Sequence, residues 1–196
     1  MSKWLSAIGR GMQWLSASRV NYWVSYVADA AMPFAFLYLG SQFESALPRA
    51  MTMASVGAGV FAFTLIEYAV HRWLFHWKIG FMVRIHDVHH CAPTEPAALP
   101  FFCAPGALVV LWVVFAMLFG AAAGSYFVAG ISAGYFWYAL LHHMEHSAWI
   151  HRPALRWLRK RYGMHVIHHQ RDKRNYGVTT SLWDHVFGTH YLANKR

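Results

Sequence analysis

The sequence predicts an all-α integral membrane protein with four transmembrane helices and a histidine-rich helical cap on the cytoplasmic side. Hydrophobic residues make up 57% of the 196 residues, against about 45–50% in an average soluble protein. Charged residues make up only 13%, which is about half the usual share. Four long apolar runs are the third observation. A chain of this length is expected to form one domain, so we predict a single membrane-embedded domain over residues 1–196.

The net charge of +9 raises nucleic acid as a partner. A basic nucleic-acid-binding domain would not also carry four long apolar runs, so we exclude that class of protein. The positive charge is instead expected to face anionic lipid headgroups.

Residues 1–19 are expected to form an amphipathic segment in the membrane interface. Apolar side chains recur there at helical spacing, at Trp4, Leu5, Ile8, Met12 and Leu15. Arg10 interrupts the segment, which therefore lacks the continuous apolar core of about 7–15 residues that a signal peptide needs. A disordered terminus is the alternative.

Four apolar segments are each long enough, at about 1.5 Å per residue, to cross most of the hydrocarbon layer. They cover residues 22–39, 50–70, 104–119 and 126–141. The first contains Asp29, which either serves function, as acids at that depth often do, or hydrogen-bonds a neighbouring helix. In the last segment Gly130 and Gly134 predict close helix packing rather than dimerisation.

Ten of the 14 histidines fall into four clusters. These are His71-x4-His76, His86-x2-His89-His90, His142-x3-His146 and His165-x2-His168-His169. Neutral imidazole is the commonest metal ligand, and helix positions i, i+3 and i+4 share a face. So many imidazoles cannot all be protonated, and unpaired neutral rings would lose hydrogen bonds; a metal site resolves both difficulties. A structural zinc site needs about four ligands, so ten candidate ligands indicate two ions. Imidazole suits iron, zinc, copper and nickel alike, so the ligand type does not identify the metal.

The clusters are expected to meet on one side of the membrane. Segments 50–70 and 126–141 each end at a cluster, and the hairpin of the last two segments returns the chain to that side. All of the 17 Lys and Arg residues except Arg49 fall on the same side, so the positive-inside rule makes it cytoplasmic. Residues 142–196 then form a cytoplasmic cap, and both termini lie there too.

Four further residues are candidates for supporting the ligands. Glu67 lies one turn before His71 and either accepts its second ring N–H or is an ordinary interfacial glutamate. Asp184 either orients a ligand histidine or caps a turn. His185 is an extra ligand, a hydrogen-bond partner of one, or neither. Asn175 turns the chain back toward the metals or makes a plain turn.

The four histidine clusters and the tail Asn175-Tyr-Gly-Val-Thr-Thr-Ser-Leu-Trp-Asp-His-Val-Phe-Gly-Thr189 resemble the fatty acid hydroxylase/sterol desaturase superfamily. The resemblance covers roughly Glu67 to Tyr191. It implies a membrane oxygenase whose ten clustered histidines hold two iron ions, with zinc as a substitute in purified protein. It also implies that O2 is the oxidant. No haem-binding extension of the cytochrome b5 type precedes the membrane core, so a separate electron-transfer protein is the expected donor.

The expected function is O2-dependent hydroxylation of an aliphatic membrane lipid, with an acyl chain as the first choice because the stretch Gly177–Asp184 looks most like the acyl-chain hydroxylases. A lipid or sterol desaturase and a carotenoid hydroxylase are the alternatives that use the same centre. A membrane metal transporter is a remote alternative, because its ligands would be expected at the membrane midplane on discontinuous helices.

Overall fold

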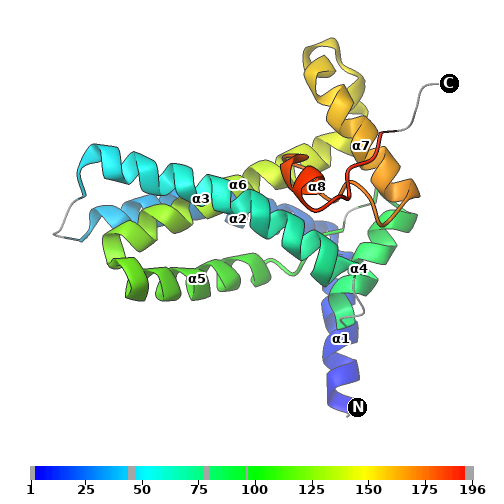
Figure 1. Ribbon diagram of the computed structural model, residues 1–196. Coiled ribbons are helices and arrows are strands. Elements are labelled where there is room, and N and C mark those ends of the chain that lie inside the picture. Colours follow the sequence, from blue (N-terminus) through cyan, green and yellow to red (C-terminus); the bar gives the residue numbers. More distant parts are fainter. Residues whose placement is uncertain (1–2, 44–46, 77–79, 96, 193–196) are drawn as a thin grey trace. The chain divides into compact units, whose positions relative to one another are not determined.

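The structure is a computed structural model that describes residues 3–43, 47–76, 80–95 and 97–192, with side chains described from residue 9 onward. Within these ranges the chain is helical and contains no strand. It forms two compact units, Met1–Phe63 with Pro96–Phe136 and Thr64–Glu95 with Trp137–Arg196. Each unit is described separately, and Figure 1 gives the element labels.

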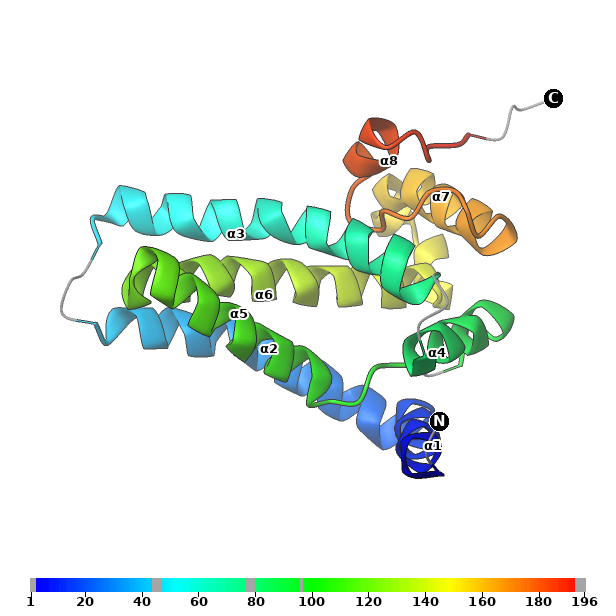
Figure 2. The same cartoon turned by 60° about the horizontal axis from the view of Figure 1, so that its bottom comes forward.

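The first unit consists of helices, most of which run side by side, while the N-terminal helix runs in a different direction (Figures 1 and 2). They are α1 (Lys3–Ser16), α2 (Arg19–Ser41), most of α3 (Arg49–Ala69), α5 (Cys103–Phe119) and the first part of α6 (Ala121–Glu145). The expected helix at the N-terminus is present, but the side chains of Trp4, Leu5 and Ile8 lie outside the described residues. Asn21 ties the start of α2 to the segment before α5, because its side chain donates to the Leu99 carbonyl (3.1 Å) and accepts from the Phe101 N–H (2.9 Å).

Helices α3 and α6 cross with their backbones in contact. A Cβ atom at Gly130 would lie 2.1 Å from the Val56 carbonyl oxygen, and one at Gly59 would lie 2.0 Å from that of Phe127. At Gly134 a Cβ atom would lie 2.8 Å from the Phe63 side chain. The prediction that Gly130 and Gly134 permit close packing is therefore confirmed.

Helices occur at all four expected spans, but they differ in how well each would cross a membrane. Among the described helices, only the continuous run Arg49–Phe75 is both long and apolar enough by itself, with a mean hydropathy of 1.6. Cys103–Phe119 is apolar but shorter. Helix α6 begins at Ala121 rather than near residue 126, because the chain reverses at Gly120 alone, which has a φ of 84°.

The second unit holds the end of α3, which continues as the π-helical turn η1 (Val70–Phe75), and the end of α6. It also contains α4 (Gly80–Cys91), the 3-10 turns η2 (Ala148–His151) and η3 (Pro153–Leu158), α7 (Arg159–Gln170) and α8 (Leu182–Val186). Its apolar core consists of four buried side chains, Leu141, Ile150, Leu158 and Val178. This core joins α6, η2, η3 and the tail, and so fixes where α7 starts relative to the end of α6.

Candidate metal centre

The ten clustered histidines converge in two groups of five in the second unit. The first histidine group is His71, His76, His86, His90 and His168, and the second is His89, His142, His146, His165 and His169. Within each group the ligand nitrogens lie within 4.8 Å of one another. All ten residues singled out in the sequence are thus brought together.

Helices α4 and α7 each supply both groups. On α4, His86 and His90 are four residues apart and belong to the first group, whereas His89 belongs to the second. On α7, His165 and His169 belong to the second group and His168 to the first. Helix positions i+3 and i+4 point about 100° apart. His89 and His90 on α4 can therefore belong to two adjacent groups, and so can His168 and His169 on α7.

The π-helical turn η1 explains the spacing of the first cluster. Two residues five apart on a regular α-helix point about 140° away from each other, because the helix has 3.6 residues per turn. His71 and His76 bracket η1, where the wider i to i+5 repeat returns the chain to the same face after five residues. Both rings therefore reach the first histidine group.

In the first histidine group the Nε2 atoms face one another. His86 Nε2 lies 3.1 Å from that of His71, and 3.0 Å from those of His76 and His90. The Nδ1 atoms of His71 and His168 contact the Tyr176 and Arg174 carbonyl oxygens at 2.6 and 2.8 Å. A carbonyl only accepts hydrogen bonds, so both Nδ1 atoms carry the proton and both Nε2 atoms present a lone pair.

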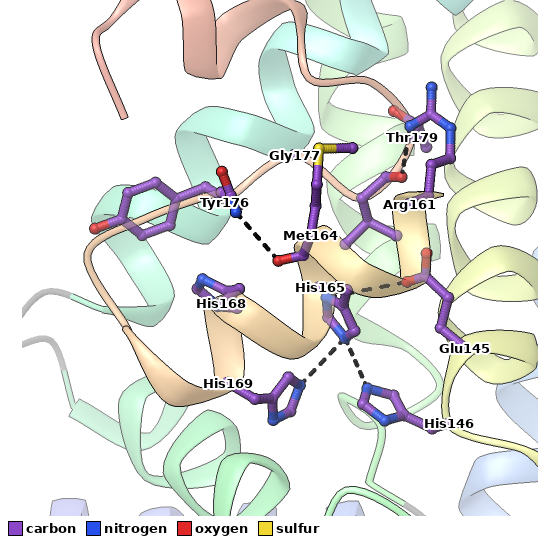
Figure 3. A network of polar contacts seen from close by, with 12 residues as sticks. Glu145, His146, Arg161, Met164, His165, His168, His169, Tyr176, Gly177 and Thr179 are labelled. Atoms are coloured by element: carbon purple, nitrogen blue, oxygen red, sulfur yellow. Dashed lines mark hydrogen bonds and ion pairs between the residues drawn. The ribbon is translucent and has the colours of Figure 1, made fainter. Parts of the chain in front are cut away.

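The second histidine group has the same inward arrangement. His165 Nε2 lies 2.7 Å from His146 Nε2 and 3.1 Å from His169 Nε2 (Figure 3). His89 Nε2 is buried and has no hydrogen-bond partner. On the outer side of the His165 ring, Nδ1 lies 3.9 Å from a carboxyl oxygen of Glu145, a residue that sequence reasoning missed.

Burial keeps these rings neutral. Desolvation, with added repulsion between neighbouring rings, lowers the pKa of His76 and His146 to about 4 and that of His168 and His169 to about 3. The pKa of His89 falls to about 2 for the same reasons. Neutral rings whose lone pairs face each other leave hydrogen-bonding capacity unused, whereas one cation in each group would use it. The donor set therefore fits a metal ion in each group.

Asp184 holds the backbone that carries the Tyr176 carbonyl. Its buried carboxyl group accepts from the Tyr176 N–H (2.8 Å), the Gly177 N–H (2.9 Å) and the Thr189 hydroxyl (2.7 Å). Asp184 thus supports His71 through the backbone rather than by contact with its ring. Asn175 adopts a positive φ of 52° and turns the chain, and its side-chain oxygen accepts from the Tyr191 N–H at 2.7 Å.

For two of the supporting residues the ligand-related alternative was wrong. Glu67 does not accept the second N–H of His71; it accepts from the Val178 and Thr179 N–H groups and the Thr179 hydroxyl, because the tail lies beside the end of α3. His185 belongs to neither group: its ring is exposed, its Nδ1 lies 2.7 Å from the carbonyl oxygen of its own helix turn, and it stacks on His190.

Glu145 has a weak signal in the sequence, and the two carbonyls have none. Glu145 precedes a ligand histidine and is almost fully buried, with an exposed fraction of 2%. Burial raises the pKa of its carboxyl group to about 8. An acid beside a histidine could have been examined as a partner, whereas a backbone carbonyl has no residue type by which to recognise it.

Fold and site together define an all-helical protein with two adjoining five-histidine groups, each able to hold a metal ion. The sequence profile of the fatty acid hydroxylase family matches residues 56–189, and the chain belongs to this family. A dihydroceramide fatty acyl 2-hydroxylase of Arabidopsis thaliana is 36% identical over 143 residues, which cover 68% of this chain and 59% of that protein.

Two further relatives extend the comparison. The fatty acid 2-hydroxylase of Homo sapiens is 31% identical over 165 residues, 79% of this chain and 44% of that protein. The structure of full-length scs7p, in which only the hydroxylase domain is visible, superposes with a TM-score of 0.75 at 25% identity and covers 89% of this chain and 68% of that one. The chain spans about half the length of the curated relatives it matches.

Proposed function

We propose that this chain hydroxylates an aliphatic lipid, an acyl chain, with O2 at a di-iron centre held by the ten histidines. The observation that carries the proposal is the convergence of ten neutral imidazoles into two metal-sized groups in a member of the fatty acid hydroxylase family. The relatives named dihydroceramide fatty acyl 2-hydroxylase and ceramide very long chain fatty acid hydroxylase support an acyl chain as substrate.

Each histidine group would hold one ion, and zinc would replace iron in some purified preparations. Iron bound there supplies the O2 chemistry that an inert C–H bond requires. The rings of His90 and His169, one from each group, stack with centroids 4.2 Å apart, which supports a shared reaction site. The Tyr176 and Arg174 carbonyls fix the orientation of His71 and His168.

Access to the centre follows from the burial of the rings. In the first group His71, His86 and His168 are buried, whereas His76 and His90 are half-buried. In the second group the half-buried rings are His142, His146 and His169. We infer that substrate approaches past these less buried rings, and that the buried ones exclude water behind them.

We also propose that residues 1–196 form one membrane-embedded domain. Residues 1–19 would lie in the interface, segments 22–39, 50–70, 104–119 and 126–141 would span, and residues 142–196 would form a cytoplasmic cap. Helix α5 supports this arrangement because Val110, Met117, Leu118 and Phe119 are 63–82% exposed on it. The distribution of Lys and Arg supports a cytoplasmic site and cytoplasmic termini. Electrons would come from a separate protein.

The test is product analysis in cells that express the chain and are grown under ¹⁸O2. Lipids are extracted, and acyl chains are analysed by mass spectrometry for a hydroxyl group that carries ¹⁸O. His76→Ala and His146→Ala should each abolish the product, because each removes a ligand from one group. His151→Ala is the matched control, since this histidine is exposed and lies outside both groups.

The product also separates the rival reactions. A new double bond without incorporated ¹⁸O would identify a desaturase, and a labelled carotenoid would identify a carotenoid hydroxylase. Lipids that stay unmodified in the presence of an electron donor and iron-loaded protein would refute the proposed function.

A further inference from the structure

The two histidine groups differ in what supports their rings from outside. In the first group, His71 and His168 turn their outer nitrogens to neutral backbone carbonyls. In the second group, the outer nitrogen of His165 faces the carboxyl group of Glu145 at 3.9 Å (Figure 3). Among the residues that the structure describes, no other carboxyl oxygen lies within 4.0 Å of a nitrogen of the ten rings. The difference is therefore specific to one group.

Glu145 and His165 each have buried polar atoms that lack a hydrogen-bond partner. Both carboxyl oxygens of Glu145 are buried without a hydrogen-bond partner, and so is Nδ1 of His165. The His165 ring cannot turn Nδ1 elsewhere, because its Nε2 already lies among the nitrogens of the second group. Buried polar groups without partners are costly, and these two lie 3.9 Å apart.

We propose that Glu145 is a positioning residue of the second histidine group. Its carboxyl group accepts the Nδ1–H of His165 and makes this group the tighter of the two metal sites. A carboxylate behind a ligand histidine fixes the ring and raises its basicity. It also places a negative charge near the cation, which a neutral carbonyl does not. Arg161 on α7 attracts the Glu145 carboxylate as well, while its own guanidinium donates to the Val178 carbonyl at 3.0 Å.

The expected effect is selective for one ion. Changes behind a metal-binding histidine typically alter metal affinity by about 10–100-fold. The full-length chain should therefore bind two Zn²⁺ ions in two separable steps. Substitution of Glu145 should weaken the tighter step by about 10–100-fold and leave the weaker step unchanged. His146→Ala should remove the tighter step and His76→Ala the weaker one, which assigns each step to a group.

The experiment titrates the full-length chain in detergent with chelator-buffered Zn²⁺ at pH 8.5 and measures zinc per chain. Three variants separate charge from shape. If Glu145 acts as a charged acceptor, Glu145→Asp should retain more of the tight binding than Glu145→Gln, and Glu145→Leu should retain the least. If Glu145 only fills space, the isosteric Gln variant should behave like the wild type and the Asp variant should be weaker. Glu95→Gln, at an exposed carboxyl group outside both histidine groups, is the matched control and should leave both steps unchanged.

The inference rests on the proposed function only because the histidine groups must bind metal. If the wild-type chain binds no Zn²⁺, the proposed metal centre itself is refuted. If it binds two ions and Glu145→Gln leaves both steps unchanged, or weakens both equally, only the role of Glu145 is refuted. Size-exclusion profiles that match the wild type show that each variant is folded, and the order of the Asp and Gln variants decides the question even where both are weakened.

Discussion

Replacing Asp184 with alanine should loosen the first histidine group without touching a histidine. The Asp184 carboxyl group, 1% exposed, accepts from two backbone N–H groups and one hydroxyl. One of these N–H groups belongs to Tyr176, whose carbonyl oxygen accepts from His71. Loss of the carboxyl group frees the Tyr176 peptide to rotate, and with it the acceptor that orients the His71 ring.

The magnitude follows from the hydrogen bonds lost. The Thr189 hydroxyl retains a partner, because the Tyr68 hydroxyl lies 2.9 Å from it. The two N–H groups lose theirs, and each buried donor left unpaired costs about 1–3 kcal/mol. The free energy of unfolding should therefore fall by about 4 kcal/mol. For a chain of this size that corresponds to a decrease in Tm of roughly 10 °C.

The assay combines thermal unfolding of the detergent-solubilised chain with zinc content per chain. Asp184→Ala should lower the Tm and release the ion of the first histidine group, while the second group keeps its ion. Lys173→Ala is the control, because Lys173 is exposed just before the tail and surface substitutions usually stay within about 0.5 kcal/mol. A wild-type Tm in Asp184→Ala, or loss of the second group's ion first, would show that the carboxyl group does not support His71 in this way.

Three further predictions follow from the geometry. His168→Ala should lower the metal content from about two ions per chain to about one, as elemental analysis would show, because in the proposed centre each group would hold its own ion. Gly130→Ala should destabilise the chain by about 1–3 kcal/mol in thermal unfolding, because its Cβ would lie 2.1 Å from the Val56 carbonyl oxygen. Gly163→Ala is the control and should leave the stability unchanged, because a Cβ there meets nothing within 4 Å. Burial lowers the pKa of His146 from 6.5 to about 4, so in the metal-free chain the contribution of His146 to stability should be complete above pH 6.5 and be lost as the pH falls toward 4, because the unfolded state binds the proton first. Unfolding of the wild type and of His146→Ala at a series of pH values tests this.

The identity of the clustered histidines could be predicted because imidazoles at regular spacing in a chain poor in acids have few structural explanations. Their division between two groups could not. The motif His86-x2-His89-His90 reads as a single helical face, yet His89 serves a different group from the other two. The rotation of about 100° between neighbouring residues assigns His89 to its group only once the positions of both groups around α4 are known. Those positions depend on α6 and α7.

The spacing His71-x4-His76 was recognised as part of a pattern without a local explanation. On a regular α-helix these rings would lie on different faces, and no pattern in the sequence predicts that α3 continues as a π-helical turn. Such turns are rare and occur frequently at functional sites. The His71 ring at this turn contacts the Tyr176 carbonyl, 105 residues further along the chain.

The supporting residues show most clearly why partners of buried acids are hard to assign from sequence. Glu67 was matched to His71 because the two lie one helical turn apart, but its carboxyl group bonds a backbone 111 residues away. Asp184 likewise holds the tail rather than a ring. Both acids fix the loop whose Tyr176 carbonyl holds His71. The rings are therefore oriented mainly by backbone that the acids hold in place, and Glu145 is the one acid in the described chain that faces a ligand ring directly.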